Sequence, residues 1–305
     1  MDLRAGTRQA RRVLIDEVFA ERGGIATRQQ LLTVMSRKTL ARHVRVGAIV
    51  RVWHGVYSLG VPDTARKLAG LDVVAGRPVV ACLHTAACLH GFGEQGDRAI
   101  HILDPGVRMR PTVGLMVHQR VGAPLIRVGD RLATAPGWTA VEMARCMNRP
   151  RALATMDAAL HLGACNPTDL WRAIDEQKGR RGIVQAREVM QYADGRAESP
   201  MESEARLVFI DGGLPKPELQ FEIVDRYGRL WRADFAWPAA MVVAEYESME
   251  WHATPLALRH DRMKTARLQE CGWTSVPIVV DDVRRRPAEL VSRISWHLER
   301  AARAG

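Results

Sequence analysis

The chain has 305 residues, which is more than one ordinary hydrophobic core supports and is typical of two or three domains of about 100–150 residues. With 47% hydrophobic and 26% charged residues, the composition is that of a globular protein and excludes a disordered one. The 44 Lys and Arg residues outnumber the 34 Asp and Glu residues, so the net charge of +10 favours a polyanionic partner such as nucleic acid.

The length of the apolar runs and the spacing of the cysteines indicate in which compartment the protein lies. No apolar run approaches the roughly 18–20 residues of a membrane-spanning helix. Asp16 and Glu17 interrupt the short apolar stretch near the start, so we expect neither a membrane segment nor a signal peptide. The five cysteines are odd in number and form no Cys-x-x-Cys pair, which is typical of reduced thiols. We therefore expect a cytoplasmic protein.

Residues 1–62 carry the pattern of three helices followed by a hairpin. Apolar spacing and capping residues predict, in chain order, a helix over residues 9–21, helices capped by Thr27 and by Ser36, and strands over residues 49–52 and 55–59. Gly23-Gly24 ends the first helix, because glycine accepts the left-handed conformation of a C-cap. This order predicts a winged helix-turn-helix DNA-binding domain.

Residues 63–196 predict a mixed α+β middle domain. Alternating residues indicate strands over residues 99–103 and 114–118 and within 125–132. Helical spacing indicates a short helix capped by Thr85 and later helices over residues 140–147, 152–162, 168–176 and 184–192. This segment contains no recognisable chemistry.

Residues 197–305 predict a third domain with an α/β pattern. Ser199-Pro200 is a favourable helix start, because serine caps the helix and proline suits its first turn. The expected elements are a helix from there to Gly212, strands over residues 219–224, 230–236 and 241–247, a helix over 256–271, a strand over 275–280 and a helix over 287–302. The order is α-β-β-β-α-β-α, and the fold class of the whole chain is a multidomain α+β protein.

The helix capped by Ser36 has a basic face. Lys38, Arg42 and Arg45 are spaced i, i+4 and i+7 and share one side, whereas Leu40 and Val44 suit the core side. A helix that enters the major groove avoids carboxylates, because phosphates border the groove on both sides. The expected DNA contacts of this region are Arg28, Arg37, Lys38, Arg42, Arg45 and Arg51.

The charge of the surrounding segment supports this interpretation. Between Arg22 and Pro62 there are seven basic residues and no Asp or Glu. The alternative is a solvated basic face on a small domain that binds another protein. Which bases would be read cannot be deduced from the sequence.

Three carboxylates in the last domain suggest a metal site. Asp234 lies on one expected strand, and Glu245 and Glu247 lie on one face of the next, because strand side chains alternate. Oxygen ligands of this kind suit Mg²⁺ or Mn²⁺. The alternative is that these are strand charges paired with Arg206, Arg229 or Arg232.

Two parts of the chain resemble known families. The run Gly23-Gly-Ile-Ala-Thr-Arg-Gln-Gln-Leu-Leu32, residues 36–47 and Arg51-Val-Trp-His-Gly-Val-Tyr57 resemble the AbiEi antitoxins, and residues 85–91 and 139–144 continue the likeness. Residues 199–283 resemble the Vsr-related endonuclease-like family of the PD-(D/E)XK superfamily. The matching stretches are Ser199-Pro-Met-Glu-Ser203, Gly213-Leu-Pro-Lys-Pro217, Arg232-Ala-Asp-Phe-Ala-Trp-Pro238, Glu245-Tyr-Glu-Ser-Met-Glu-Trp-His252 and Asp261-Arg-Met-Lys264.

The second resemblance implies an active site. It assigns Asp234 and Glu245 to the metal ion and Glu247 to the third catalytic position. The remaining implied site residues are Glu202 on the first helix, His252 at the rim, and Arg262 and Lys264 as phosphate partners. The chain departs from the family where Glu247-Ser248 replaces Asp-Gly, and it lacks the usual superfamily lysine at position 247.

Two functions follow as expectations. The favoured one is a Mg²⁺-dependent endonuclease that cuts double-stranded DNA. Family analogy alone suggests a defence or toxin–antitoxin setting for it. The alternative is a non-catalytic transcriptional regulator, like an antitoxin repressor, with a degenerate nuclease fold. A third reading is a protein-interaction adaptor. The expected assembly is a homodimer or a complex with a cognate partner protein.

Overall fold

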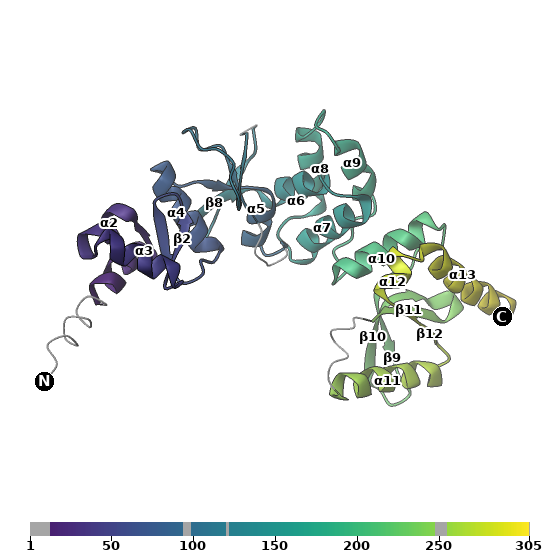
Figure 1. Ribbon diagram of the computed structural model, residues 1–305. Helices are drawn as coiled ribbons and strands as arrows, with labels where there is room; N and C mark the ends of the chain where they lie inside the picture. The colour runs from purple at the N-terminus through teal and green to yellow at the C-terminus, as the bar shows by residue number, and fades with distance from the viewer. Residues whose placement is uncertain (1–12, 94–98, 120–121, 248–254, 305) are drawn as a thin grey trace, which may run out of the picture. The chain divides into compact units, whose positions relative to one another are not determined.

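The computed structural model describes residues 13–93, 99–119, 122–247 and 255–304 (Figure 1). Over these residues the protein is of mixed α+β type, with three sheets and many helices. It forms two compact units, Met1–Ala135 and Pro136–Gly305. The boundary between these units lies within the predicted middle segment, and the three predicted domains stay a prediction.

The first part of unit 1 contains three helical segments and a three-stranded sheet. Its elements are a helix over residues 13–20, β1 (Ile25–Thr27), α2 (Arg28–Val34), α3 (Arg37–Arg45), β2 (Ile49–Trp53) and β3 (Val56–Leu59). The strands run in the order β1-β3-β2, and both pairings are antiparallel. The predicted order of helices and hairpin is confirmed, whereas β1 was not predicted.

The predicted caps of α2 and α3 are confirmed. The Thr27 hydroxyl accepts a hydrogen bond from the Gln30 amide, and the Gln30 side chain accepts one from the Thr27 amide. The Ser36 hydroxyl accepts one from the Thr39 amide. These bonds satisfy amide groups that the first turn of a helix leaves without partners. Both helices therefore begin where local side-chain chemistry places them.

A five-stranded sheet follows in unit 1, in the order β6-β5-β4-β8-β7. Its strands are β4 (Val80–Ala81), β5 (Ile100–Leu103), β6 (Leu115–His118), β7 (Leu125–Val128) and β8 (Arg131–Thr134), and its helices are α4 (Thr64–Ala75) and α5 (Leu83–Leu89). Leu68 and Leu71 of α4 pack against Ile100 and Ile102 of β5. The predicted cap at Thr85 is wrong: Thr85 lies inside α5 and its hydroxyl accepts a hydrogen bond from the His101 amide at 2.8 Å.

Unit 2 begins with four helices, all of which were predicted. They are α6 (Pro136–Ala144), α7 (Arg149–His161), α8 (Pro167–Glu176) and α9 (Ile183–Met190). Asn148 and Asn166 cap α7 and α8, and each is followed closely by a proline in the first turn. α6 begins earlier than expected, because Pro136 suits the first turn of a helix.

The rest of unit 2 is a four-stranded sheet between helices, in the order β12-β11-β10-β9 (Figure 1). Its elements are α10 (Pro200–Asp211), β9 (Glu218–Val224), β10 (Leu230–Trp237), a 3-10 turn (Pro238–Ala240), β11 (Val242–Tyr246), α11 (Pro255–Glu270), β12 (Thr274–Ile278), α12 (Val280–Arg284) and α13 (Pro287–Ala304). β11 and β12 are parallel and the other pairs are antiparallel. The predicted order is confirmed with one addition, the short helix α12.

Two hydrophobic clusters cover the two faces of this sheet. On one face Phe235 and Val242 pack against Phe209 of α10 and Ile294 of α13. On the other face Trp231, Ala233 and Val243 pack with Leu268 of α11. The sheet is therefore buried on both sides, and polar groups inside it need partners.

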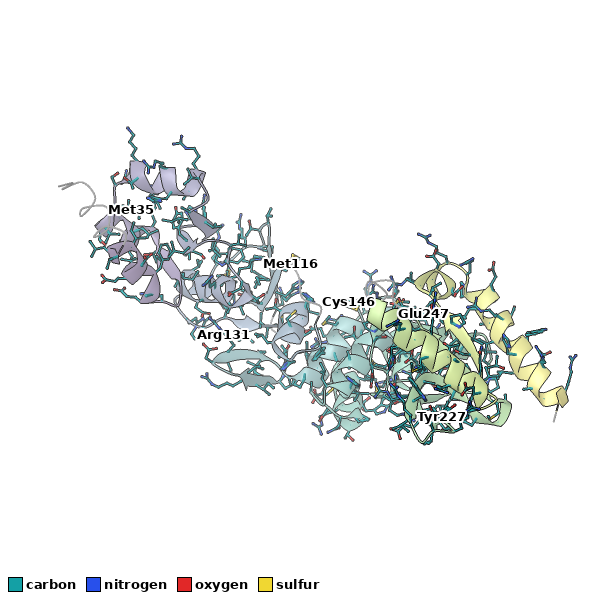
Figure 2. All side chains as sticks on the ribbon, turned by 90° about the horizontal axis from the view of Figure 1, so that it is seen from below. Met35, Met116, Arg131, Cys146, Tyr227 and Glu247 are labelled. Atoms are coloured by element: carbon teal, nitrogen blue, oxygen red, sulfur yellow. The ribbon has the colours of Figure 1, made fainter. Side chains whose placement is uncertain are left out.

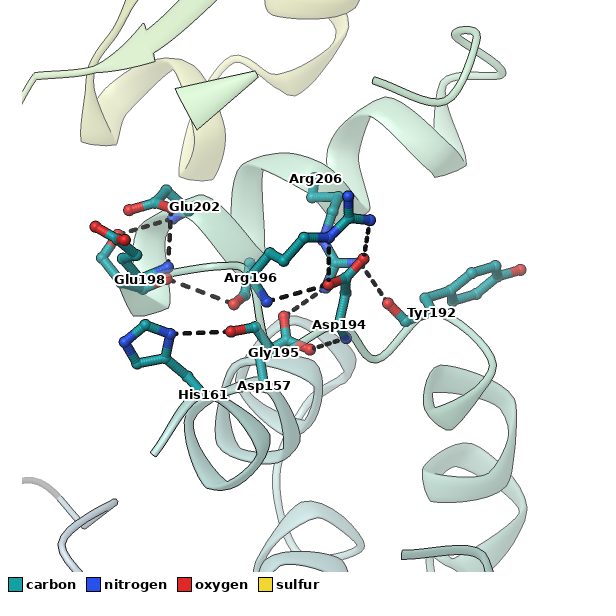
Figure 3. Close-up of polar contacts among 11 residues, drawn as sticks. Asp157, His161, Tyr192, Asp194, Gly195, Arg196, Glu198, Glu202 and Arg206 are labelled. Atoms are coloured by element: carbon teal, nitrogen blue, oxygen red, sulfur yellow. Dashed lines mark hydrogen bonds and ion pairs between the residues drawn. The ribbon is translucent and has the colours of Figure 1, made fainter. Parts of the chain in front are cut away.

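A buried ion pair joins α7 to α10 within unit 2 (Figure 3). The Arg206 guanidinium lies 2.5 Å from the Asp157 carboxylate, and the two side chains are 4% and 1% exposed. Arg206 also donates to the Tyr192 carbonyl, and Asp157 accepts from the Asp194 amide at 2.7 Å. Arg206 therefore links α10 to α7, and the alternative that it pairs with the strand carboxylates is wrong.

Candidate functional site

The basic face of α3 lies on the surface of unit 1. Leu40 is buried against Phe19, Leu31 and Ile49 and fixes the helix on its core side. The opposite side chains are exposed at Arg37, Lys38, Arg42 and Arg45, as is Arg28 at the start of α2. Within the described part of the chain, none of these five cations is paired with a carboxylate. Their charge is therefore directed to solvent.

The hairpin beside α3 carries a further cation. Arg51 is exposed on β2, and its guanidinium lies 2.8 Å from Nδ1 of His54 in the turn. Trp53 of the same strand donates its indole N–H to the Lys67 carbonyl of α4 at 2.7 Å. This bond ties the hairpin to α4, so the turn that carries Arg51 and His54 is held in place.

In unit 2 the ladder between β9 and β10 is interrupted at Gln220 and Asp234. Ala233 pairs with Phe221 and Phe235 with Leu219, but the two residues between them form no ladder pair. Gln220 has φ of +52°, a left-handed conformation that is costly for a residue with a Cβ. Strained backbone of this kind concentrates at functional sites, so the location of Asp234 at this break is informative.

Asp234 and Glu245 occupy neighbouring strands near this break. Oδ2 of Asp234 accepts a hydrogen bond from the Tyr246 amide at 2.8 Å. Glu245 lies 2.5 Å from the ammonium of Lys264 on α11, and these two side chains are 21% and 15% exposed. Burial raises the pKa of Asp234 and of Glu245, although Lys264 opposes both shifts. The three side chains form one electrostatically coupled group.

Glu202 of α10 extends this group. Its Oε2 accepts a hydrogen bond from the Gln220 side chain at 2.9 Å and one from the Glu198 amide at 3.0 Å (Figure 3). Burial raises the pKa of Glu202, and the charge of Asp234 raises it further. Glu202 thus has a structural role at the start of α10 and also faces the candidate site. We call Glu202, Asp234, Glu245 and Lys264 the carboxylate–lysine cluster.

Of the other predicted site residues, Glu247 and Arg262 are exposed and His252 falls outside the described ranges. Glu247 is exposed just after β11 (Figure 2), and its amide donates to the Ile278 carbonyl at 2.8 Å. Arg262 is exposed on α11, and Arg232 pairs with Glu198 at 2.6 Å. That Glu245 and Glu247 share one face stays a prediction, and the ion-pair partner of Glu245 is Lys264.

Over the described ranges, the carboxylate–lysine cluster does not form a complete metal cage. Among the described residues, no three His, Cys, Asp or Glu side chains are grouped so as to hold a metal ion. Mg²⁺ is commonly bound by one or two carboxylates, with water and substrate phosphates completing its shell. Asp234 and Glu245 fit that smaller requirement, whereas a cage made by the protein alone does not fit.

Comparison with known proteins places the chain in a family. The Uncharacterized protein Rv2248 of Mycobacterium tuberculosis strain H37Rv is 61% identical over 271 residues, which cover 89% of this chain and 100% of the relative. The Uncharacterized protein MT2308 of strain CDC 1551 / Oshkosh matches to the same extent. The chain belongs to the Rv2248 family.

One region of this Rv2248-family protein also matches a wider family. Residues 79–192 match the AbiEi antitoxin C-terminal domain, so the antitoxin-like part of the predicted resemblance is confirmed. The match covers most of the predicted middle segment. No helix in the described ranges has the length and apolarity needed to cross a membrane.

Two features of the cluster escaped sequence reasoning. Gln220 follows an ordinary strand pattern, and nothing local in the sequence indicates a left-handed residue there. Lys264 was predicted as a phosphate partner and not as the ion-pair partner of Glu245. The absence of a lysine at position 247 was the available signal, since a buried carboxylate needs a cation from elsewhere in the fold.

Proposed function

We propose that this protein binds double-stranded DNA through α3 and acts as an antitoxin-type transcriptional regulator. The observation that carries the proposal is the exposed face of Arg37, Lys38, Arg42 and Arg45, which within the described residues meets no carboxylate. Cations on one face of a helix neutralise phosphates and let the helix enter the major groove. The helices and hairpin around α3 support a winged helix-turn-helix reading.

The match of residues 79–192 to the AbiEi antitoxin C-terminal domain supports the regulatory setting. An antitoxin acts with a partner, so we propose a cognate protein partner or a homodimer on the DNA. A two-fold dimer would recognise a palindrome whose half-sites are about one helical turn apart.

Selection from a random duplex library tests the main proposal. Wild type should enrich a defined sequence, because side chains at base edges discriminate between bases. The variant Arg42→Ala/Arg45→Ala should lose that enrichment and retain its fold by circular dichroism. Arg172→Ala/Arg187→Ala removes two exposed arginines from α8 and α9 and is the matched control. Equal enrichment by all three proteins would refute a role of α3.

A second candidate function is hydrolysis of DNA at the carboxylate–lysine cluster. The specific observation in its favour is the pair of carboxylates Asp234 and Glu245, whose pKa values are both raised by burial. Glu245 forms an ion pair with Lys264, whose charge also acts on Asp234, and the left-handed Gln220 lies at the same break in the sheet. Sites with displaced pKa values and strained backbone are candidates for chemistry. When bound, Mg²⁺ or Mn²⁺ would polarise the phosphodiester and activate water. Lys264 would then contact the phosphate.

Plasmid cleavage tests this second candidate. Supercoiled DNA is incubated with wild type or Asp234→Asn in Mg²⁺, Mn²⁺ or EDTA. A nuclease predicts nicking that needs the metal and is lost in the variant, which keeps an acceptor for the Tyr246 amide. Failure of wild type to cut, with duplex binding intact, would leave the regulator as the function.

A further inference from the structure

The turn between β9 and β10 carries an exposed tyrosine held between two arginines. Tyr227 is 61% exposed and is marked in Figure 2. The guanidinium carbons of Arg226 and Arg267 lie 4.8 and 4.1 Å from its ring centre. Arg226 also donates to the phenol oxygen at 2.6 Å. Hydrogen bonds from Arg267 and Arg226 lower the pKa of Tyr227.

A third arginine, Arg229, lies over the next aromatic ring. The Arg229 guanidinium lies 4.1 Å from the ring centre of Trp231, whose other ring contact is His260 of α11 at 5.4 Å. The indole N–H of Trp231 donates to the buried Asp225 at 2.9 Å, so the platform under Arg229 is fixed. Within the described residues the guanidinium of Arg229 is paired with no carboxylate; it is the backbone N–H of Arg229 that donates to Asp225, at 2.9 Å. The guanidinium charge is available to a ligand.

The arrangement favours phosphate over a stacked base. Two guanidinium groups lie over the Tyr227 ring, which leaves less of that ring for stacking by a nucleobase. The Arg229 guanidinium is paired with no carboxylate among the described residues, and a planar guanidinium fork matches phosphate oxygens. Glu270 pairs with Arg226 at 3.1 Å and with Arg267 at 2.8 Å and orients both, but it cancels only one of the charges.

We propose that Arg226, Tyr227, Arg229 and Arg267, the β9–β10 cluster, bind the phosphate backbone of double-stranded DNA as a second DNA-binding surface. Exposed Arg259 and Arg262 on α11 extend the row of cations. A DNA backbone presents phosphates at regular intervals and so needs such a row. Arg229 contacts Met263, the neighbour of Lys264, so bound DNA would continue toward the carboxylate–lysine cluster. The inference rests on the proposed function as a DNA-binding protein and adds a site outside α3.

Salt dependence of binding tests the proposal on the full chain. The affinity for a short fluorescein-labelled duplex of random sequence is measured by anisotropy over a range of salt concentrations. For Arg226→Ala/Arg229→Ala the slope of log affinity against log salt should become less steep by about 1.8, since each lost phosphate contact removes about 0.9. Arg172→Ala/Arg187→Ala removes the same charge from exposed positions elsewhere in unit 2 and should leave the slope unchanged.

The outcomes separate this inference from the proposed function. An unchanged slope in Arg226→Ala/Arg229→Ala overturns the β9–β10 cluster, and so does a loss confined to single-stranded DNA. Arg42→Ala/Arg45→Ala reports on α3 alone. A shallower slope in Arg42→Ala/Arg45→Ala only would keep DNA binding by α3 and reject the β9–β10 cluster. A shallower slope in Arg226→Ala/Arg229→Ala only would keep the cluster and reject DNA binding by α3.

Discussion

The ammonium of Lys264 lies 2.5 Å from the Glu245 carboxylate, and burial nevertheless keeps the pKa of that carboxyl above its ordinary range. A lysine from a helix therefore supplies the charge that the neighbouring strand position 247 does not, since Glu247 is itself acidic. The pair joins α11 to β11 at the point where Asp234 also lies. This ion pair holds Lys264 of α11 against Glu245 of β11.

Removing only one partner of this pair should destabilise the protein. Lys264→Met leaves Glu245 buried without a cation and should lower the free energy of unfolding by about 2 kcal/mol. The double variant Lys264→Met/Glu245→Gln removes the orphaned charge and should recover much of the loss. Urea unfolding followed by tryptophan fluorescence measures both. A double variant no more stable than the single one would show that the pair is not coupled.

Asp234 should make stability depend on pH. Burial raises the pKa of Asp234 in the folded protein above the ordinary value of 3.8. Its contribution to the free energy of unfolding is therefore fully present below pH 3.8 and is lost as the pH rises through the folded pKa. Asp234→Asn cannot ionise and escapes this loss. The stability of the variant relative to wild type should therefore increase between about pH 4 and about pH 7. Urea unfolding across that range checks it; a difference that is flat or falls with pH contradicts the shift.

Gln220 offers a test of backbone strain. Both Gln220→Ala and Gln220→Gly remove the hydrogen bond to Glu202, but only glycine adopts φ of +52° without a Cβ penalty. The glycine variant should be more stable than the alanine variant by about 1 kcal/mol, against the usual order in strands. Thermal and urea unfolding of the two variants give the comparison. Greater stability of the alanine variant would mean that this backbone conformation carries no strain.

The ion pair between Arg206 and Asp157 should be one of the most sensitive points of unit 2. Arg206→Met leaves a buried carboxylate without its cation, and the loss of stability should be about 3–5 kcal/mol. Burial already raises the pKa of Asp157, so the lone carboxyl should take up a proton. Arg206→Met/Asp157→Asn should be more stable than Arg206→Met. A change below about 1 kcal/mol in the single variant would contradict a buried pair.

Sequence patterns predicted the parts of the fold that local chemistry determines. The caps at Thr27 and Ser36 depend on residues three positions away, and the strand–helix order of unit 2 depends on apolar spacing. α4 was not predicted, and it contains Gly70 in its interior. That glycine is required by a distant contact, since a Cβ there would lie 2.8 Å from the Trp53 ring.

The carboxylate–lysine cluster was predicted in part. Asp234 and Glu245 follow from strand register, because neighbouring antiparallel strands bring their side chains together. The position of Lys264 depends on how α11 crosses the sheet, and the left-handed Gln220 depends on tertiary packing. Neither is encoded within a few residues of the site, so no local pattern reveals them.

The most direct test of the account is the affinity of Arg42→Ala/Arg45→Ala for the duplex selected by wild type, measured by anisotropy beside Arg172→Ala/Arg187→Ala. Loss of two phosphate or base contacts predicts markedly weaker binding and a slope against log salt that is less steep by about 1.8. The control should bind as wild type does. If both double variants keep wild-type affinity and slope, α3 does not bind DNA and the central claim is wrong.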